Sequence, residues 1–214
     1  GVKPGQKLEF GKTFSDRMFI MKFDHGDWHD AAIKKYGNLE LSPAATVLHY
    51  AQEIFEGLKA YYRADGKIGL FRPKDNFTRM NNSAERMCLP MIDKDFVLKA
   101  LRELLQLDKG WVPQAEGTSL YIRPTLIGID PKVGLKPAEE CLFYIIMSPV
   151  GAYYAHGFEP VKIIVEDKYV RAVRGGIGAA KTGANYAASM LAAKEAQEKG
   201  FDQVLWLDGV ERKY

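Results

Sequence analysis

The chain has 214 residues, of which 47% are hydrophobic and 27% are charged. This composition is typical of a folded globular protein and excludes disordered and collagen-like classes. The 30 basic and 27 acidic side chains leave a net charge of +3 without runs of like charge, so neither nucleic-acid nor membrane binding is predicted. No apolar stretch approaches the roughly 18 residues of a membrane-spanning helix. Cys88 and Cys141, the two cysteines, lack metal-ligand neighbours, so no metal site is predicted and a reducing, cytoplasmic location is favoured.

Residues 1–154 are predicted to form an N-terminal α+β domain. Short runs rich in apolar and β-branched residues indicate strands, and these runs are Met18–Phe23, Ala60–Arg63, Ile68–Phe71, Ser119–Ile129 and Cys141–Val150. The ADG sequence at residues 64–66 predicts a hairpin turn between the second and third of them. Apolar residues at three- and four-residue steps predict helices over Asp75–Met87 and Asp95–Leu107. Strands on either side of two amphipathic helices indicate an α+β domain.

Residues 155–160 have no periodicity and are predicted to link this domain to a second one at 161–214. The second domain is predicted to contain strands at Val161–Glu166 and Val204–Leu207 and a helix at Asn185–Lys199. Asp208-Gly209 is a typical hairpin turn. Domains below about 70 to 80 residues rarely close a core without extra cross-links. The second domain is therefore predicted to be incomplete in this chain.

Lys181 is the first candidate catalytic residue, because it lies between a glycine-rich stretch, Arg174–Gly183, and a predicted helix. A single lysine is usually a solvated surface charge. The sequence IGAAKTGANYAA around Lys181 contains no other charge, which indicates a sheltered amine with a depressed pKa, as covalent chemistry on a carbonyl requires. Tyr186 could place a phenol near that amine. The glycines match neither the dinucleotide fingerprint nor the phosphate-binding loop, so nucleotide binding is disfavoured.

The N-terminal domain adds two arginines and several aromatic residues. Arg79 lies four residues after Asp75, so it could form an ion pair on a helix surface or turn inward and bind a phosphate or carboxylate. Arg123 lies in an otherwise apolar strand, where a guanidinium needs an anionic partner. The aromatic residues would by default be core residues, with a binding pocket as the alternative; these are Phe10, Tyr50, Phe55, Tyr121 and Tyr153.

Six segments, in order and spacing, resemble the branched-chain aminotransferases, which are pyridoxal-phosphate enzymes of fold type IV. The segments are FGKTF at 10–14, LHYAQEIFEGLKAY at 48–61, LFRPKDNFTRMNNSAERMCLP at 70–90, SLYIRPTLIG at 119–128, SPVGAYY at 148–154, and GGIGAAKTGANYAAS through QVLWLDG at 175–209. The resemblance implies a two-domain α/β (α+β) fold with the cofactor between the domains. It also implies transfer of the amino group of L-leucine, L-isoleucine or L-valine to 2-oxoglutarate, giving branched 2-oxo acids and L-glutamate.

By the same resemblance, Lys181 would carry pyridoxal phosphate covalently, Tyr186 would hydrogen-bond its phenolic oxygen, and Arg79 would hold its phosphate. The substrate-binding residues would be Phe10, Tyr50, Phe55, Tyr121, Arg123, Val133, Leu135 and Tyr153. Of these, Tyr50, Val133 and Leu135 would complete the pocket across a homodimer interface.

The resemblance ends before the glutamate that, in the family, pairs with the pyridine nitrogen, since the sequence stops at Tyr214. A chain truncated at its C-terminus and impaired in catalysis is therefore expected. Two alternatives stay open. One is a relative of the same fold acting on D-amino acids or on aminodeoxychorismate, against which FGKTF and SLYIRP argue. The other is a non-catalytic fragment.

Overall fold

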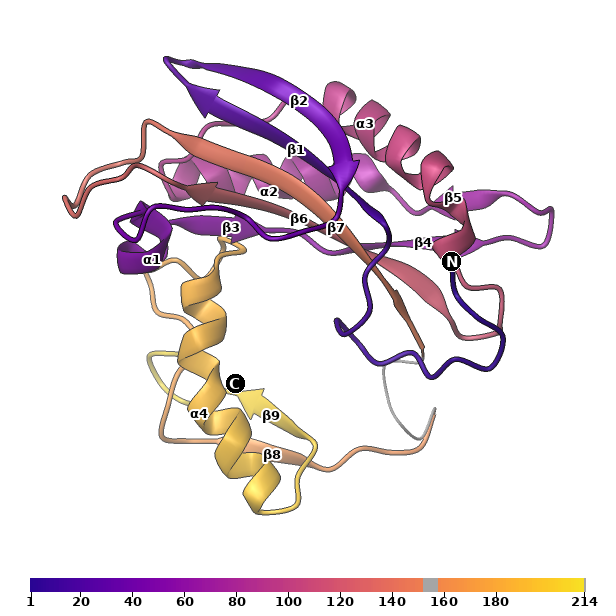
Figure 1. Ribbon diagram of the computed structural model, residues 1–214. Helices are drawn as coiled ribbons and strands as arrows, with labels where there is room; N and C mark the ends of the chain where they lie inside the picture. Colours follow the sequence, from indigo (N-terminus) through magenta and orange to yellow (C-terminus); the bar gives the residue numbers. More distant parts are fainter. Residues whose placement is uncertain (152–157, 214) are drawn as a thin grey trace.

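A large antiparallel sheet, two helices on one of its faces and a smaller α/β unit make up the computed structural model, which describes residues 1–151 and 158–213 (Figure 1). The sheet has seven strands in the order β2-β1-β7-β6-β4-β5, with β3 also paired to β6. Its strands are β1 (Arg17–Asp24), β2 (Asp27–Lys35), β3 (Glu53–Phe55), β4 (Leu58–Tyr62), β5 (Ile68–Leu70), β6 (Ser119–Gly128) and β7 (Cys141–Val150). The predicted mixture of strands and helices in the N-terminal domain is thus confirmed.

The centre of the sheet is the pairing of β6 with β7, which runs over ten residue pairs from Ser119–Val150 to Gly128–Cys141. Most of these residues are buried on both faces, which explains the nearly continuous apolar sequence of β7. The predicted hairpin forms between β4 and β5. These central strands carry Tyr121 and Arg123 on β6, while the short β3 carries Phe55.

Two helices, α2 (Pro73–Arg86) and α3 (Lys94–Leu107), cover one face of the sheet (Figure 1). Proline at the first position of α2 suits a helix start, because its missing N–H would have no partner there. At the start of α3, the Asp93 carboxylate accepts hydrogen bonds from the backbone N–H groups of Asp95 and Phe96, both at 3.0 Å. The core between these helices and the sheet includes Phe77, Leu101 and Phe143. A short helix, α1 (Thr46–Tyr50), lies between β2 and β3, and a 3-10 turn at Lys109–Trp111 follows α3.

The strand β2 was not predicted, because most of its side chains are exposed and its apolar residues do not alternate clearly. The feature that indicates this strand is the turn between β1 and β2. His25 and Gly26 both have positive φ angles, 48° and 82°, as in the type I′ turns that join tightly paired strands. The structure thus extends the sheet by one edge strand on the far side of β1.

The smaller unit consists of β8 (Ile163–Glu166), α4 (Gly183–Glu198) and β9 (Gln203–Trp206), with β8 and β9 paired in parallel. A helix between two parallel strands is the usual crossover connection. The strands and helix predicted for this region are present with slightly different ends. The hairpin predicted at Asp208 is absent, since no strand follows in the described residues up to 213. Instead, the Asp208 carboxylate accepts hydrogen bonds from the backbone N–H groups of Val210, Glu211 and Lys213, at 2.9, 2.7 and 2.9 Å.

The predicted linker, residues 155–160, lies partly outside the described residues, and the proposed domain limits stay a prediction. No helix within residues 1–151 and 158–213 is long and apolar enough to cross a membrane. In the same part of the chain, no group of three or more His, Cys, Asp or Glu side chains is arranged to hold a metal ion.

Candidate active site

Lys181 belongs to the smaller unit by sequence, but its backbone is held by the large sheet and its helices. Its N–H donates to Ser83 Oγ on α2 at 2.8 Å, and its carbonyl accepts from the backbone N–H of Phe55 on β3 at 3.0 Å. Ser83 is itself buried. The backbone N–H and C=O of Lys181 are thus both fixed by the first domain.

The turn around Lys181 is anchored on both sides. Asn185 donates from Nδ2 to the carbonyl oxygens of Ile177 and Ala180, each at 2.8 Å, which closes the turn before the helix. Thr182 Oγ1 donates to the carbonyl oxygen of Glu53 at 2.6 Å. The Thr182 contact joins the start of α4 to β3, and it was not found by sequence analysis because its partners lie 129 residues apart along the chain.

Glu53 also places a carboxylate at the N-terminus of α4, where its Oε1 accepts from the backbone N–H of Gly183 at 2.5 Å. A carboxylate there interacts favourably with the helix dipole. Burial raises the pKa of Glu53, while the Gly183 hydrogen bond and the charge of Arg123 act in the opposite direction. A Cβ at position 183 would overlap the Glu53 carboxylate, which explains why a glycine follows Thr182.

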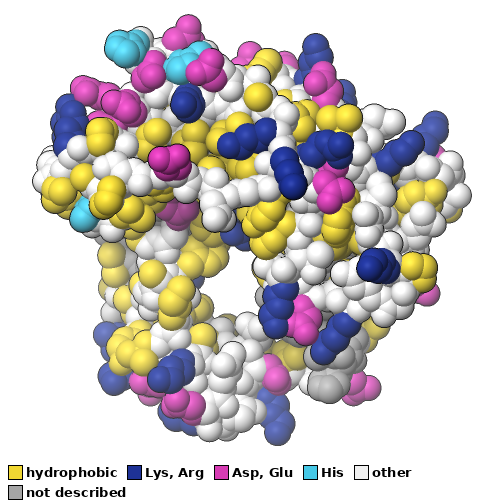
Figure 2. Space-filling model, in the orientation of Figure 1, with side chains coloured by type: hydrophobic (Ala, Val, Ile, Leu, Met, Phe, Trp, Pro, Cys, Tyr) yellow, Lys and Arg dark blue, Asp and Glu magenta, His cyan; other side chains and the backbone are white. Residues whose placement is uncertain are grey.

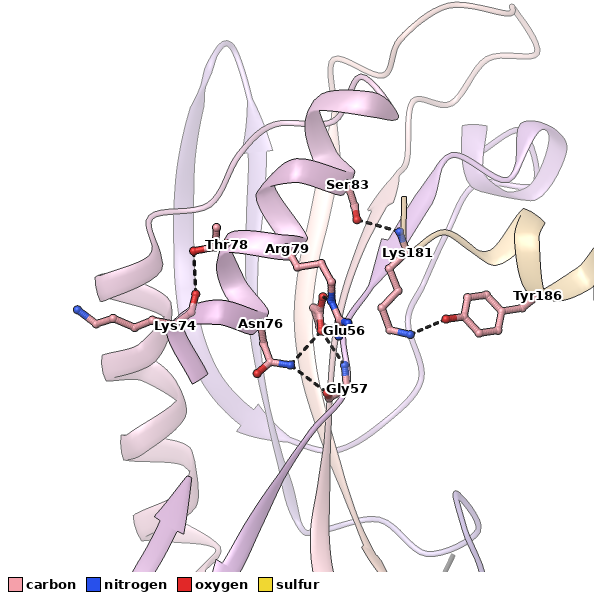
Figure 3. Close-up of polar contacts among 9 residues, drawn as sticks. All are labelled: Glu56, Gly57, Lys74, Asn76, Thr78, Arg79, Ser83, Lys181 and Tyr186. Carbon is pink, nitrogen blue, oxygen red and sulfur yellow. Dashed lines mark hydrogen bonds and ion pairs between the residues drawn. The ribbon is translucent and has the colours of Figure 1, made fainter. Parts of the chain in front are cut away.

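The Lys181 amine lies within hydrogen-bond distance of a phenol. Its Nζ donates to Tyr186 Oη at 2.6 Å (Figure 3), and Tyr186 lies one turn into α4. The same Nζ lies 4.5 Å from the centre of the Phe55 ring and 4.8 Å from that of Tyr186, and these rings pack against each other at 4.9 Å. The predicted neighbourhood of Lys181 and Tyr186 is therefore present, with Phe55 as a third member.

Arg79 does not pair with Asp75. Its Nε donates to Glu56 Oε1 at 2.7 Å and its Nη2 donates to Glu56 Oε2 at 2.8 Å, whereas Asp75 pairs with Arg72 at 2.6 Å. The helix-surface ion pair, one of the two alternatives for Arg79, is thus wrong, because the side chain turns toward the segment between β3 and β4. The contact with Glu56 raises the pKa of Arg79. In Figure 3 the side chains of Arg79 and Lys181 extend from α2 and from the start of α4 toward the same region.

Arg123 and its neighbours form a second part of the site, which shares Phe55 with the first. The Arg123 guanidinium lies 4.5 Å from the centre of the Phe55 ring, the same ring that Lys181 Nζ contacts. Arg123 Nη2 donates a hydrogen bond to Tyr121 Oη at 2.9 Å. Phe10 packs edge-on against Tyr121 at 4.9 Å. Among the described residues, the Nε of Arg123 is buried without a hydrogen-bond partner, and its charge acts on the Glu53 carboxylate. Glu53 is thus the anionic group near Arg123 in this part of the chain, without a direct hydrogen bond between them.

A cavity of about 190 Å³ opens beside Tyr121 and Arg123. Its lining comes from the N-terminal segment and from β6 and β7; it comprises Phe10, Gly11, Phe14, Tyr121, Arg123, Ile146, Met147 and Ser148. Most of these side chains are apolar, and the guanidinium supplies the charge. The cavity is smaller than the roughly 300 to 1,000 Å³ of most small-molecule sites, but an apolar lining with few polar groups is typical of them. Figure 2 shows, in addition, an opening between the large sheet and the smaller unit.

The remaining predicted pocket residues lie apart from Lys181. Tyr50, at the end of α1, donates from Oη to the carbonyl oxygen of Val133 at 3.4 Å, and Val133 and Leu135 lie in the segment after β6 with exposed fractions of 63% and 83%. Tyr153 lies outside the described residues. The structure of one chain thus groups Phe10, Phe55, Tyr121 and Arg123 but leaves Tyr50, Val133 and Leu135 as a separate exposed cluster.

Comparison with known proteins identifies the family. The family model described as amino-transferase class IV matches residues 53–211, and the chain belongs to this family. Among curated proteins, the chain is 52% identical over 209 residues to branched-chain-amino-acid transaminase 1 of Bacillus subtilis, a match that covers 97% of this chain and 59% of that protein. It is 50% identical over 202 residues to a branched-chain-amino-acid aminotransferase of Dictyostelium discoideum, covering 94% of this chain and 53% of that protein.

Solved structures share the fold. A branched-chain aminotransferase of Thermoproteus uzoniensis crystallised with norvaline matches with a TM-score of 0.75 and 22% identity, covering 91% of this chain and 60% of that one. A T.th. branched-chain amino acid aminotransferase with pyridoxamine 5'-phosphate matches with a TM-score of 0.70 and 24% identity, covering 88% and 59%. The predicted fold-type IV architecture is confirmed. The chain spans somewhat under 60% of the length of the curated relatives named above.

Proposed function

We propose that this chain contributes the lysine-bearing site of a pyridoxal-phosphate-dependent aminotransferase that acts on branched-chain L-amino acids with 2-oxoglutarate. The observation that carries the proposal is the fixed pair of Lys181 Nζ and Tyr186 Oη, 2.6 Å apart, at the start of α4. It is supported by the identity of about half of all aligned residues to proteins named as branched-chain aminotransferases.

The described residues fit pyridoxal phosphate. Lys181 offers a primary amine for the cofactor's aldehyde, and Tyr186 offers a hydroxyl beside it. Arg79 uses its Nε and Nη2 on Glu56, so its remaining N–H groups are open to a phosphate. Bound at this site, the cofactor would supply a conjugated ring that takes up the negative charge left on a substrate carbon after proton loss.

The residues of the chain divide the remaining work. The amine of Lys181 would act as general base and acid: it would accept the proton from the substrate α-carbon and deliver it to the cofactor carbon that carried the aldehyde. Tyr186 Oη holds Nζ in one direction, and the backbone hydrogen bonds of Lys181 keep this residue in register with α2 and β3. Phe55 covers Nζ with an apolar ring, which excludes water from one side of the amine.

Substrate selection is assigned to the cavity beside β6 and β7. Its apolar lining suits a branched aliphatic side chain, and the Arg123 guanidinium in that lining suits the second carboxylate of glutamate. Discrimination among leucine, isoleucine and valine should be modest, because one methylene in an apolar pocket changes binding by about 1 to 3 kcal/mol. We also propose that the enzyme is cytoplasmic and homodimeric, with Tyr50, Val133 and Leu135 facing the partner's site.

The full-length protein tests these proposals. Purified with pyridoxal phosphate and treated with borohydride, it should carry the cofactor on the peptide that contains Lys181, as read by mass spectrometry. Labelling of a different lysine would refute the assignment. Turnover of L-leucine with 2-oxoglutarate, compared with turnover of D-alanine, separates the branched-chain activity from that of D-amino acid relatives. Lyase activity on aminodeoxychorismate would instead indicate the other relative of the same fold. A dimer mass by sedimentation checks the oligomeric state.

A further inference from the structure

Glu56 is a fully buried carboxylate, 0% exposed, between β3 and β4. Besides the two bonds from Arg79, its Oε2 accepts from Asn76 Nδ2 and from the backbone N–H of Gly57, both at 3.2 Å (Figure 3). Its own N–H donates to the carbonyl oxygen of Pro124 on β6 at 2.9 Å. A buried charge needs such partners, and with donors from α2 and from its own segment the carboxylate has a fixed place and orientation.

The contact with Arg79 uses one side of the guanidinium. Arginine carries five N–H groups in a planar fork, and Glu56 takes those of Nε and one of Nη2. The groups left over are both of Nη1 and the second of Nη2, and one N–H from each of these two nitrogens forms the adjacent Nη1–Nη2 edge of the fork. Because the Nε side is fixed on Glu56, this free edge is held in one direction, as a bidentate contact with a phosphate requires.

Charge and geometry act in opposite directions here. The negative charge of Glu56 lies next to Arg79 and reduces its attraction for an anion. If charge alone mattered, removing it would tighten phosphate binding. The Arg79 side chain is long and half exposed, so without Glu56 it would sample many rotamers. Phosphate binding would then cost the entropy of restricting it to one rotamer.

We propose that Glu56 is a positioning residue for the cofactor phosphate: it holds the Arg79 guanidinium side-on, so that the Nη1–Nη2 edge is presented to the phosphate. This inference rests on the proposed function, since it needs a phosphate-bearing cofactor at Lys181. Asn76 supports the same arrangement, because its Nδ2 bridges Glu56 Oε2 and the carbonyl oxygen of Gly57 at 3.1 Å.

The test compares pyridoxal phosphate with pyridoxal, which has the aldehyde but no phosphate. Both are titrated into the full-length apoprotein, and the absorbance of the lysine-bound form gives a Kd for each. In Glu56→Gln the Kd for pyridoxal phosphate is expected to rise about tenfold, which is the lower end of the loss in metal affinity when a residue that orients a metal ligand is removed. The Kd for pyridoxal should stay within about twofold. The matched control is Asp75→Asn, which removes a carboxylate from the exposed arginine pair at the start of the same helix and should change neither Kd.

The outcomes are distinct. A tighter Kd for pyridoxal phosphate in Glu56→Gln would show that the carboxylate acts only as a countercharge and would overturn the inference. An equal rise of both Kd values would show a general structural role and would overturn it as well, as would no change. If Glu56→Gln does not fold, Asn76→Ala decides by the same ratio, with a rise for pyridoxal phosphate alone in support. If the unsubstituted protein binds neither aldehyde, the proposed function itself fails.

Discussion

The two parts of the molecule differ in how they bury their apolar residues. In the large sheet, β6 and β7 pair over ten residues and pack under α2 and α3 around fully buried side chains such as Leu101 and Phe143. In the smaller unit, β8 and β9 pair over four residues, and Ile163, Val165 and Leu205 stay about half exposed. The first part thus has a core of its own, whereas the second has little.

The reactive lysine follows from this difference. Lys181 lies in the weakly packed unit by sequence, but its peptide is hydrogen-bonded to Ser83 and Phe55 in the strongly packed one. The site therefore takes its rigidity from the large sheet, while Tyr186 on α4 supplies the second functional group. Rigid elements hold a catalytic geometry more closely than loops do. The predictions below test this division, from the largest expected effect to the smallest.

Replacement of Lys181 should have the largest effect. In Lys181→Ala the transamination rate of the full-length enzyme should fall by at least about 10³-fold, because both the covalent attachment and the general base are lost. Steady-state assays with L-leucine measure the rate, and Lys194→Ala, at an exposed lysine on α4, is the control. Undiminished activity in Lys181→Ala would contradict the assignment of the site.

Matched leucine truncations should separate the two parts by stability. Leu101→Ala, in the core under α3, should lower the unfolding free energy by about 2 to 5 kcal/mol. Leu205→Ala on β9, where the side chain is half exposed, should cost less than about 1 kcal/mol. Urea denaturation followed by circular dichroism measures both. Equal losses would mean that the full-length protein packs the smaller unit as closely as the sheet.

Ser83→Ala tests the attachment of Lys181 to the first domain. The variant removes the acceptor for the Lys181 N–H, and an unsatisfied buried donor costs about 1 to 3 kcal/mol. The smaller unit should be cleaved faster in limited proteolysis, because one of its anchors is lost. Thr78→Ala, an exposed hydroxyl on the same helix, is the control and should leave the cleavage rate unchanged. Equal cleavage of the Ser83→Ala variant and the unsubstituted protein would mean that this hydrogen bond does not hold the unit.

Local patterns in the sequence predicted most elements of the large sheet and its helices. The apolar steps of α2 and α3 and the continuous apolar run of β7 are signals within single segments. The edge strand β2 was missed because its partner β1, not its own composition, makes it a strand. The parallel pairing of β8 with β9 was not predicted either, because it depends on the crossover through α4.

The candidate site was predicted in part. Lys181, Tyr186, Phe55 and Arg123 were singled out, and the structure brings them together around one aromatic ring. Helical spacing offered Asp75 as a partner of Arg79, which is wrong, whereas the true partner, Glu56, lies 23 residues away along the chain. A carboxylate between apolar residues, as in IFEGL, is a signal of the kind that drew attention to Arg123, and it could have identified Glu56. Glu53 and Ser83 gave no such signal, since their roles arise only from contacts across the fold.

The smallest predicted effect is on the pH dependence of stability, where the two parts should respond with opposite sign. Burial raises the pKa of Glu53, on β3 of the large sheet, above its ordinary value of 4.5. Its contribution to stability is therefore fully present below pH 4.5 and is lost as the pH rises through the higher value in the folded protein. In the smaller unit, hydrogen bonds from the backbone of Tyr169 and Lys168 lower the pKa of Glu166 below 4.5. Its contribution is present above pH 4.5 and is lost as the pH falls through the lower value.

Unfolding free energies of Glu53→Gln, Glu166→Gln and the unsubstituted protein test these signs when they are measured from about 1.5 pH units below to about 2.5 pH units above the ordinary glutamate pKa. As the pH rises, the unfolding free energy of Glu53→Gln should increase relative to that of the unsubstituted protein. The unfolding free energy of Glu166→Gln should instead decrease relative to it. The Glu166 effect should be the smaller one, because that carboxylate is exposed to water, which screens its interactions. Parallel shifts in the two variants would mean that Glu53 is not held in a less solvated environment than Glu166, and the contrast between the two parts of the molecule would then not extend to their electrostatics.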